Sequence, residues 1–145
     1  MKILLIHGPN LNMLGRRDPN LYGTFTLDDL YEELVDQYPS IEFTYFQSNH
    51  EGELIDVIQE SLDEDYDGLI INPGAYTHTS IAIRDALELI HYLKVEVHLS
   101  DLSKRESFRQ IDVIIDVCDA CFMGKKMESY FEAVEYILKQ KENTH

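Results

Sequence analysis

The sequence predicts an α/β fold, an open and doubly wound parallel sheet with helices on both faces. Apolar runs with the spacing of strands alternate with apolar stripes at helical spacing along the 145 residues. Two of the runs, residues 3–6 and 69–71, are continuously apolar, as in parallel strands buried on both faces. The alternation occurs five times without a linker or an internal repeat, so we expect one domain over residues 1–145.

The N-terminal half continues from the first strand with a helix, an edge strand and a second helix. Residues 27–34 carry apolar side chains at helical spacing. Thr26 before them and Asp29 three residues later form an N-terminal capping pattern. Residues 41–45 alternate apolar and polar side chains, which favours a half-exposed edge strand. A second helical stripe covers residues 54–62.

The C-terminal half repeats this order after the buried strand at residues 69–71. A third helical stripe runs over residues 83–90 and a fourth over residues 130–138. Between them, residues 95–97 belong to a strand in which apolar side chains alternate with polar ones, and residues 120–123 form the expected last strand.

Charge is distributed unevenly along the chain. The sequence holds 27 acidic and 12 basic side chains, for a net charge of −15, and residues 18–83 contain 15 of the acids and neither Lys nor Arg. Neutralising phosphate groups would require a basic face, so this distribution argues against nucleic-acid binding. The same distribution argues against binding to anionic membrane surfaces, because such binding also requires a basic face.

The chain shows no signal for export or membrane insertion. The apolar run at residues 3–6 is too short for a signal peptide, and no run approaches the roughly 18 apolar residues of a membrane span. With two cysteines, Cys118 and Cys121, the expected location is the reducing cytoplasm.

Neither the cysteines nor the histidines have the spacing of a metal site. Cys118 and Cys121 are spaced as in redox or zinc motifs, but a second pair is missing and the segment leads into the last strand, so we interpret both as structural. The six histidines lack the His-Glu-x-x-His pattern, and no carboxylate cluster suits a hard ion. We therefore expect neither a metal nor another cofactor.

Ligands of open parallel sheets bind beyond the carboxyl ends of the strands, where strand order reverses. The sequence there offers three polar loops, which follow Ile6, Ile71 and Val97 and are rich in amide, imidazole or hydroxyl groups: residues 8–12, 72–78 and 98–100. We expect the functional site where these loops meet.

The loop over residues 8–22 carries the first chemical candidates, Arg17 and Tyr22. Its Gly and Pro content favours an ordered start and a mobile middle, and the absence of Gly-Lys-Ser/Thr after Gly8 excludes a nucleotide-binding loop. A tyrosine hydroxyl is a poor base near neutrality unless a cation stabilises the phenolate. Arg17 would supply that cation. The alternative is that Tyr22 packs the loop and the arginines are solvated.

His98 is the second candidate. The period of a strand places Glu96 and His98 on one face, where the carboxylate would fix the imidazole tautomer and raise the pKa of His98, making a proton donor. Ser100 is a natural N-cap, so Leu99 and Ser100 would offer backbone N–H groups to an anion at a helix start. The alternative is a structural histidine with satisfied hydrogen bonds.

Further polar residues complete the candidate set: Asn72, His78, Asp85, Arg105 and Arg109. Arg105 and Arg109 are about one helical turn apart, so both would face the same way. With Arg16 and Arg17 they place four of the 12 basic residues in or beside the expected site. Their alternative role is surface ion pairing with Asp101 or Glu106.

Four blocks of the sequence together resemble one enzyme family, the type II 3-dehydroquinate dehydratases. The resemblance is strong from Lys2 to about Arg109 and weaker beyond. The blocks are residues 8–12 with Arg17, Pro19, Tyr22 and Gly23, then residues 46–53, residues 72–80 and residues 96–100. The resemblance implies a flavodoxin-like, three-layer fold with five parallel strands in the order 2-1-3-4-5.

The resemblance also implies a lyase of the shikimate pathway, which leads to chorismate and aromatic amino acids. Such an enzyme dehydrates 3-dehydroquinate to 3-dehydroshikimate through an enolate. Tyr22 would be the base, Arg17 would hold it as phenolate, and Asn10 would stabilise the enolate through a water. His98, oriented by Glu96, would protonate the departing hydroxyl.

The remaining site residues would bind the substrate. The resemblance assigns its carboxylate to the backbone N–H groups of Leu99 and Ser100, which act with Asn72, and its hydroxyls to His78 and Arg109. Asp85 would reach the site of a neighbouring subunit in a homo-oligomer, typically a dodecamer built from trimers. Neither a metal nor a Schiff-base lysine would be required.

Three features depart from the family pattern. His7 replaces the usual Asn before Gly8, Lys94 stands where Pro is frequent, and residues 110–113 differ from the family's polar stretch. They bear on the subunit contacts and on the shape of the site near Arg109.

Two other classes predict different sequences. A flavin-binding or phosphoryl-receiving module predicts a hydroxyl-rich loop or paired acids after the first strand, which residues 8–10 do not offer. An inactive scaffold would be expected to have lost Arg17, Tyr22 or His98. The sequence leaves open whether the enzyme would serve biosynthesis or the breakdown of quinate.

Overall fold

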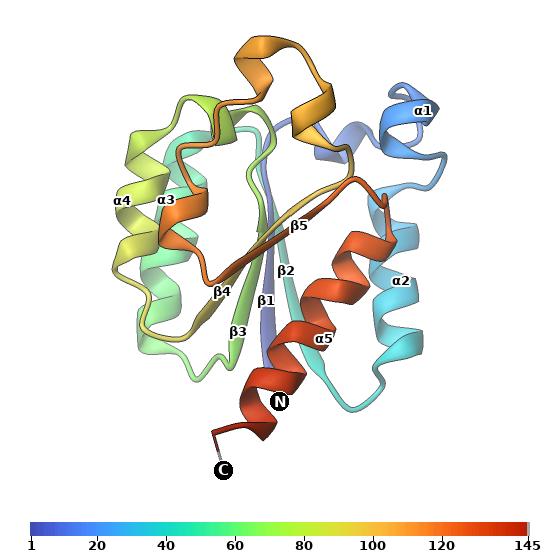
Figure 1. The fold of residues 1–145 in the computed structure, drawn as a ribbon. Coiled ribbons are helices and arrows are strands. Elements are labelled where there is room, and N and C mark those ends of the chain that lie inside the picture. Colours follow the sequence, from blue (N-terminus) through green and yellow to red (C-terminus); the bar gives the residue numbers. More distant parts are fainter. Residues whose placement is uncertain (145) are drawn as a thin grey trace.

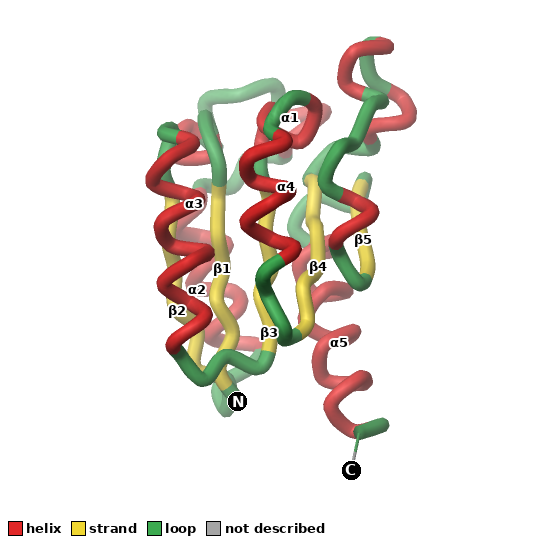
Figure 2. The backbone as a smooth tube through the Cα atoms, turned by 90° about the vertical axis from the view of Figure 1, so that its left-hand side faces the viewer, coloured by secondary structure: helices red, strands yellow, loops and turns green. Residues whose placement is uncertain are grey.

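A computed structural model describes residues 1–144 and contains one five-stranded sheet (Figures 1 and 2). All neighbouring strands pair in parallel, in the order β2-β1-β3-β4-β5. The predicted strand order is thus confirmed, with β2 at one edge. The strands are β1 (Lys2–His7), β2 (Glu42–Gln47), β3 (Gly68–Asn72), β4 (Leu93–His98) and β5 (Ala120–Met123).

Helices cover both faces of the sheet, which makes the three layers expected from the sequence. In Figure 1, α2 and α5 lie on one face and α3 and α4 on the other, while the short α1 lies beyond the carboxyl ends of the strands. The helices are α1 (Pro19–Tyr22), α2 (Leu27–Gln37), α3 (Glu51–Glu60), α4 (Ile81–Glu88) and α5 (Glu128–Glu142).

The start of α2 shows why the sequence pattern located it. The Thr26 hydroxyl accepts a hydrogen bond from the Asp29 N–H at 3.1 Å, and the Asp29 carboxylate accepts one from the Thr26 N–H at 2.9 Å. This reciprocal capping satisfies two N–H groups that have no partner within the helix, so the predicted capping box is confirmed.

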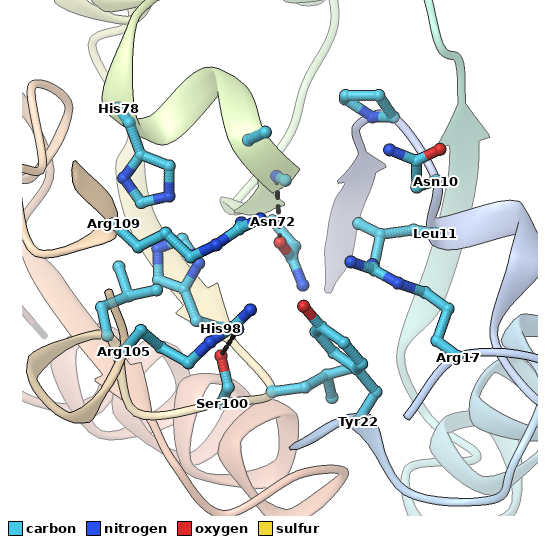
Figure 3. A pocket seen from close by; sticks show the side chains of 15 residues that line it. Asn10, Leu11, Arg17, Tyr22, Asn72, His78, His98, Ser100, Arg105 and Arg109 are labelled. Carbon is cyan, nitrogen blue, oxygen red and sulfur yellow. Dashed lines mark hydrogen bonds between the residues drawn. The ribbon is translucent and has the colours of Figure 1, made fainter. Parts of the chain in front are cut away.

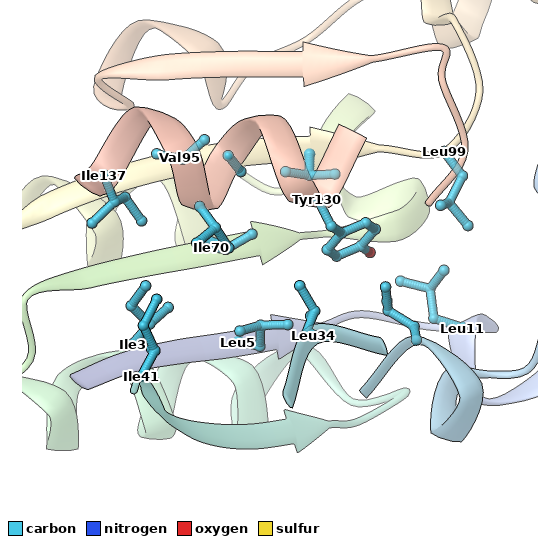
Figure 4. Close-up of a cluster of buried hydrophobic side chains, with 14 of the residues drawn as sticks. Ile3, Leu5, Leu11, Leu34, Ile41, Ile70, Val95, Leu99, Tyr130 and Ile137 are labelled. Atoms are coloured by element: carbon cyan, nitrogen blue, oxygen red, sulfur yellow. The ribbon is translucent and has the colours of Figure 1, made fainter. Parts of the chain in front are cut away.

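The core has one half on each face of the sheet because successive side chains of a strand point in opposite directions. Ile3 and Leu5 of β1 pack with α2 and α5, in the cluster of Figure 4. Leu4 and Ile6 pack with α3 and α4 on the opposite face. A strand covered on both faces is therefore continuously apolar, as residues 3–6 are.

The connections differ from the expected ones at two places. The loop after β1 holds a 3₁₀ turn (Leu11–Met13) and α1, so Tyr22 is the last residue of a short helix. After β4 no long helix begins. A 3₁₀ turn (Leu102–Lys104) follows, and its cap is Asp101, whose carboxylate accepts from the Ser103 N–H at 3.0 Å.

The N-cap predicted at Ser100 is therefore wrong, because Asp101 takes that position. Arg105 and Arg109 do not share a helical turn either, since they belong to separate segments of irregular backbone and 3₁₀ turn. Within residues 1–144, no helix has both the length and the apolar character needed to cross a membrane.

Candidate active site

A pocket of about 90 Å³ opens at the carboxyl ends of β1, β3 and β4, where the sequence placed the site (Figure 3). Asn10 follows β1, Asn72 ends β3 and His98 ends β4, and these three strands are neighbours in the sheet. Ligand binding at this edge follows from the parallel arrangement, because every carboxyl end points the same way.

Most of the predicted site residues line this pocket: Asn10, Arg17, Tyr22, Asn72, His78, His98, Leu99, Ser100 and Arg109. Arg105 lines it as well. Glu96 is fully buried behind His98 rather than in the lining. Asp85 is an exposed residue of α4 and is absent from the pocket of this chain.

The loop after β1 approaches the loop after β3 closely, and Gly8 permits this. The Gly8 N–H donates to the Asn72 carbonyl at 2.8 Å, and a Cβ atom at position 8 would lie 2.3 Å from the Pro73 carbonyl oxygen. From the side of β2, Asn49 Oδ1 accepts from the Asn10 N–H at 3.0 Å and Gln47 Nε2 donates to the Gly8 carbonyl at 3.2 Å. Block 46–53 thus holds the pocket loop in place.

Tyr22 lies between two guanidinium groups. The Cζ atom of Arg17 is 3.8 Å from the centroid of the Tyr22 ring, and that of Arg105 is 5.5 Å away. The short helix α1 holds the ring there: Asp18 caps it by accepting from the Asn20 N–H at 2.9 Å. The sequence predicted the Arg17 contact and placed Arg105 in or beside the site, but it did not indicate that Arg105 lies against Tyr22.

Arg105 and Arg109 share one carboxylate at the rim of the pocket. Glu106 accepts from Arg109 Nε at 2.8 Å, and Arg105 Nε lies 3.5 Å from Glu106. The hydrogen bond from Arg109 lowers the pKa of Glu106. Arg105 also donates to the Ser100 hydroxyl at 2.9 Å. Both arginines therefore pair with Glu106, as the alternative expected, and they also line the pocket.

The lining is positive in a strongly acidic chain. It includes three arginines and two histidines, and the lining residues, all within the described part of the chain, include neither Asp nor Glu. The whole chain carries a net charge of −15. A cleft lined by one sign of charge concentrates ligands of the opposite sign, so this pocket suits a small anion.

A buried polar chain fixes Asn72. Its Oδ1 accepts from the Gly74 N–H at 3.2 Å, and its Nδ2 donates to the Tyr130 hydroxyl at 3.0 Å. Tyr130 in turn bonds His7 Nε2 at 2.9 Å, and His7 Nδ1 bonds the Tyr31 hydroxyl at 3.1 Å. Burial lowers the pKa of His7 to about 3, so the imidazole is neutral and has one donor and one acceptor nitrogen.

The pair of Glu96 and His98 has the predicted arrangement but not the predicted acidity. His98 Nε2 is hydrogen-bonded to Glu96 Oε2, and both side chains are buried. The expectation of a raised pKa for His98 is wrong, because burial disfavours the imidazolium and lowers that pKa to about 4. Burial also raises the pKa of Glu96.

His78 joins the pocket to the segment after β4. Its Nδ1 donates to the Ile111 carbonyl at 2.7 Å. The other ring nitrogen, Nε2, takes no part in this hydrogen bond and is available to a ligand. The Val113 N–H donates to the Thr77 carbonyl at 2.9 Å in the same region. These contacts dock residues 111–113 against the turn that carries His78.

The fold also gathers donor atoms that the sequence kept apart. Glu96, His98, Asp112 and Cys121 have ligand atoms within 4.8 Å of one another. Their spacing in the sequence does not reveal such a set, because Asp112 and Cys121 belong to other segments than β4. However, the imidazole Nε2 is already bonded to Glu96, and burial raises the pKa of Cys121 and keeps it a neutral thiol. Proximity alone therefore does not make these residues a metal centre.

The two cysteines are free thiols, and burial raises the pKa of Cys118 as it does that of Cys121. A buried neutral thiol is a poor nucleophile, which agrees with their interpretation as structural residues.

Comparison with known proteins finds one family and close relatives. The family model described as dehydroquinase class II matches residues 1–138. The chain is 49% identical to a 3-dehydroquinate dehydratase of Thermotoga maritima, with 98% of each chain covered. It is 51% identical to that of Thermotoga neapolitana, with 96% of this chain and 95% of that one covered.

Solved structures agree. A type II dehydroquinase from Butyrivibrio crossotus superposes with a TM-score of 0.92 at 46% identity, covering 94% of this chain and 97% of the other. One from Propionibacterium acnes gives a TM-score of 0.89 at 33% identity, covering 94% of each chain.

Proposed function

Because the chain belongs to the class II dehydroquinase family, we propose that it is a lyase that removes water from 3-dehydroquinate to give 3-dehydroshikimate. This reaction would place it in the shikimate pathway to aromatic amino acids. The observation that carries the proposal is the pocket itself, lined by three arginines and two histidines and by no acid, in a chain of net charge −15.

Tyr22 acts as the base. As phenolate it takes the proton from the carbon next to the ketone of the substrate, and the electron pair of that C–H bond forms an enolate. Arg17, at 3.8 Å from the ring centroid, stabilises the phenolate, and Arg105 adds a second positive charge at 5.5 Å. A positioned base of this kind contributes about 10² to 10⁴ in rate.

Asn10 and His98 complete the elimination. Asn10 stabilises the enolate oxygen through a water molecule. The enolate then re-forms the ketone, the bond to the departing hydroxyl breaks, and His98, acting as the imidazolium, gives that hydroxyl its Nδ1 proton so that it leaves as water, while the Nε2–H stays bonded to Glu96. Because burial disfavours the imidazolium, the negative charge of Glu96 is needed to stabilise it for this step. Glu96, bonded to Nε2, orients the imidazole so that Nδ1 is the nitrogen available to the substrate.

The other lining residues hold the substrate. The backbone N–H groups of Leu99 and Ser100 bind its carboxylate with Asn72, without the help of a helix dipole, since no long helix begins there. His78 and Arg109 bind its hydroxyls. Arg105, bonded to the Ser100 hydroxyl, brings a further cation to the carboxylate subsite.

Asp85 acts in a neighbouring subunit. It is exposed on α4 and outside the pocket of its own chain, which agrees with a role across an interface. We expect a dodecamer that is built from trimers. We also expect the protein to be located in the cytoplasm. Static light scattering of the purified protein should give a mass of about twelve chains, and a monomer would contradict the role of Asp85.

The direct test of the activity is the addition of 3-dehydroquinate to the purified chain while the ultraviolet absorbance of the conjugated enone product is followed. Absorbance should rise with a rate proportional to enzyme concentration, and it should rise equally after dialysis against a chelator. It should also rise equally after treatment with borohydride in the presence of substrate, which would trap a Schiff base, once the reagents have been removed and fresh substrate added. Folded protein that gives no rise would contradict the proposal.

A further inference from the structure

Behind the pocket, the carboxyl group of the buried Glu96 meets that of the half-buried Asp112. Glu96 of β4 bonds His98 through Oε2, and its other oxygen, Oε1, is buried without a hydrogen-bond donor. Asp112 lies against it, with Oδ2 buried and equally without a donor. Two carboxyl groups with oxygen atoms within 4.8 Å of each other would repel if both were ionised. A proton between them would satisfy both oxygens.

The backbone determines which oxygen of Asp112 faces Glu96. Oδ1 accepts from the N–H groups of Ile114 at 2.9 Å and Ile115 at 3.0 Å. The segment is anchored in turn by the hydrogen bond from the Val113 N–H to the Thr77 carbonyl. Oδ2 is therefore left for Glu96, and an amide at this position would keep its oxygen on the backbone and turn its NH₂ toward Glu96.

We propose that Asp112 is a positioning residue for the reaction: it is held as a neutral acid that donates a hydrogen bond to Glu96 and so keeps Glu96 ionised and aimed at His98. This inference rests on the proposed function. Asp112 is not a lining residue of the pocket, so it acts through Glu96 and does not touch the substrate.

The protonation of Asp112 has a definite pH range. Burial and the neighbouring Glu96 raise the pKa of Asp112 to about 7. The groups that face it are Glu96 and His98 of β4, Cys121 of β5 and Cys118 of the preceding turn. Both thiols are neutral because burial raises their pKa. As pH rises through about 7, Asp112 loses its proton, the carboxylates repel, and Glu96 no longer orients the imidazole.

Three variants test this role through the pH dependence of turnover of 3-dehydroquinate. Asp112→Ala removes the donor and should lower kcat about tenfold or more, with KM changed less than about twofold. Asp112→Asn keeps a donor that does not titrate, so it should retain most of the kcat at pH 6 and lack the decline that the wild type shows as Asp112 ionises. Asp116→Asn, an exposed acid in the same segment, should match the wild type.

A spectroscopic measurement keeps the inference separate from the activity. Infrared spectra at pH 6 should show the carbonyl band of a neutral carboxylic acid in the wild type and in Asp116→Asn, and not in Asp112→Asn. Inactive protein that shows this band would refute the proposed function alone. Active protein in which Asp112→Asn has the wild-type pH profile and the same carboxylic-acid band would overturn the role of Asp112.

Discussion

Single residues in the pocket differ in what they contribute, and Arg105 is the clearest case. Its side chain is 9% exposed, lies beside Tyr22 and donates to the Ser100 hydroxyl at 2.9 Å. A partly desolvated guanidinium interacts with an anion more strongly than an exposed one, because less water screens it. We therefore expect Arg105 to act mainly in binding the substrate carboxylate.

Arg105→Gln should raise the KM for 3-dehydroquinate about tenfold or more, since hydrogen bonds to charged groups contribute roughly 1.5 to 3 kcal/mol. Steady-state kinetics at constant ionic strength measure this. The matched control is Lys125→Gln, which removes an exposed cation that is paired with Glu132 and is not among the lining residues of the pocket. A KM equal to that of the wild type in Arg105→Gln would contradict the binding role.

Elements are joined under the pocket by the Tyr130 hydroxyl. Tyr130 lies on α5, His7 ends β1 and Asn72 ends β3, so one buried hydroxyl links a helix to two strands. The same hydroxyl accepts from Asn72 Nδ2 and so fixes the orientation of the amide, with Oδ1 accepting from the Gly74 N–H. The stability of the sheet edge and the geometry of the pocket thus depend on one group.

Tyr130→Phe should lower the free energy of unfolding by about 1 to 3 kcal/mol, because it leaves buried polar atoms of His7 and Asn72 without a partner. It should also raise KM, since Asn72 is then free to turn. Urea denaturation and kinetics measure the two effects. Tyr136→Phe on the same helix, whose hydroxyl makes one exposed hydrogen bond of 3.4 Å, should change neither.

Most of the elements could be predicted from the sequence alone, but the contacts between distant segments could not. The strands, the four long helices and the capping box at Thr26 follow from local patterns, and the meeting of three polar loops follows from the rules of parallel sheets. The contact between His7 and Tyr130 spans 123 residues and has no local pattern. The position of Arg105 depends on 3₁₀ turns that hydrophobic periodicity does not encode.

The acidity of His98 could not be predicted for a related reason. A strand pattern places Glu96 beside His98 and suggests a raised pKa, but the burial of the imidazole depends on the packing of the whole sheet edge. Burial disfavours the charged imidazolium and lowers the pKa of His98 instead. The family resemblance implied roles for the site residues, whereas no local pattern indicated that the Asp112 carboxyl lies against Glu96.

Over the whole molecule, buried histidines link stability to pH. Burial lowers the pKa of His7 to about 3, whereas a histidine in the unfolded chain titrates near 6.5. Between these values the unfolded chain binds a proton that the folded chain does not. The stability that neutral His7 provides is therefore fully present above about pH 6.5 and is lost as pH falls toward 3.

The free energy of unfolding should accordingly fall between pH 6.5 and pH 4, with His7 contributing up to about 1.4 kcal/mol per pH unit. Denaturant titrations at several pH values measure the slope. His7→Gln should reduce this slope, and His91→Gln, which alters an exposed histidine, should leave it unchanged. Equal slopes in all three proteins would contradict the burial of a neutral His7.

Tyr22, flanked by Arg17 and Arg105, is the proposed base of the dehydration. The most direct test of this role is the turnover of 3-dehydroquinate by Tyr22→Phe, followed by enone absorbance beside the wild type and Tyr136→Phe. We expect kcat of Tyr22→Phe to fall by about 10² or more, with Tyr136→Phe unchanged, because the phenyl ring keeps the shape and loses the base. Wild-type turnover in Tyr22→Phe would show that Tyr22 is not the base.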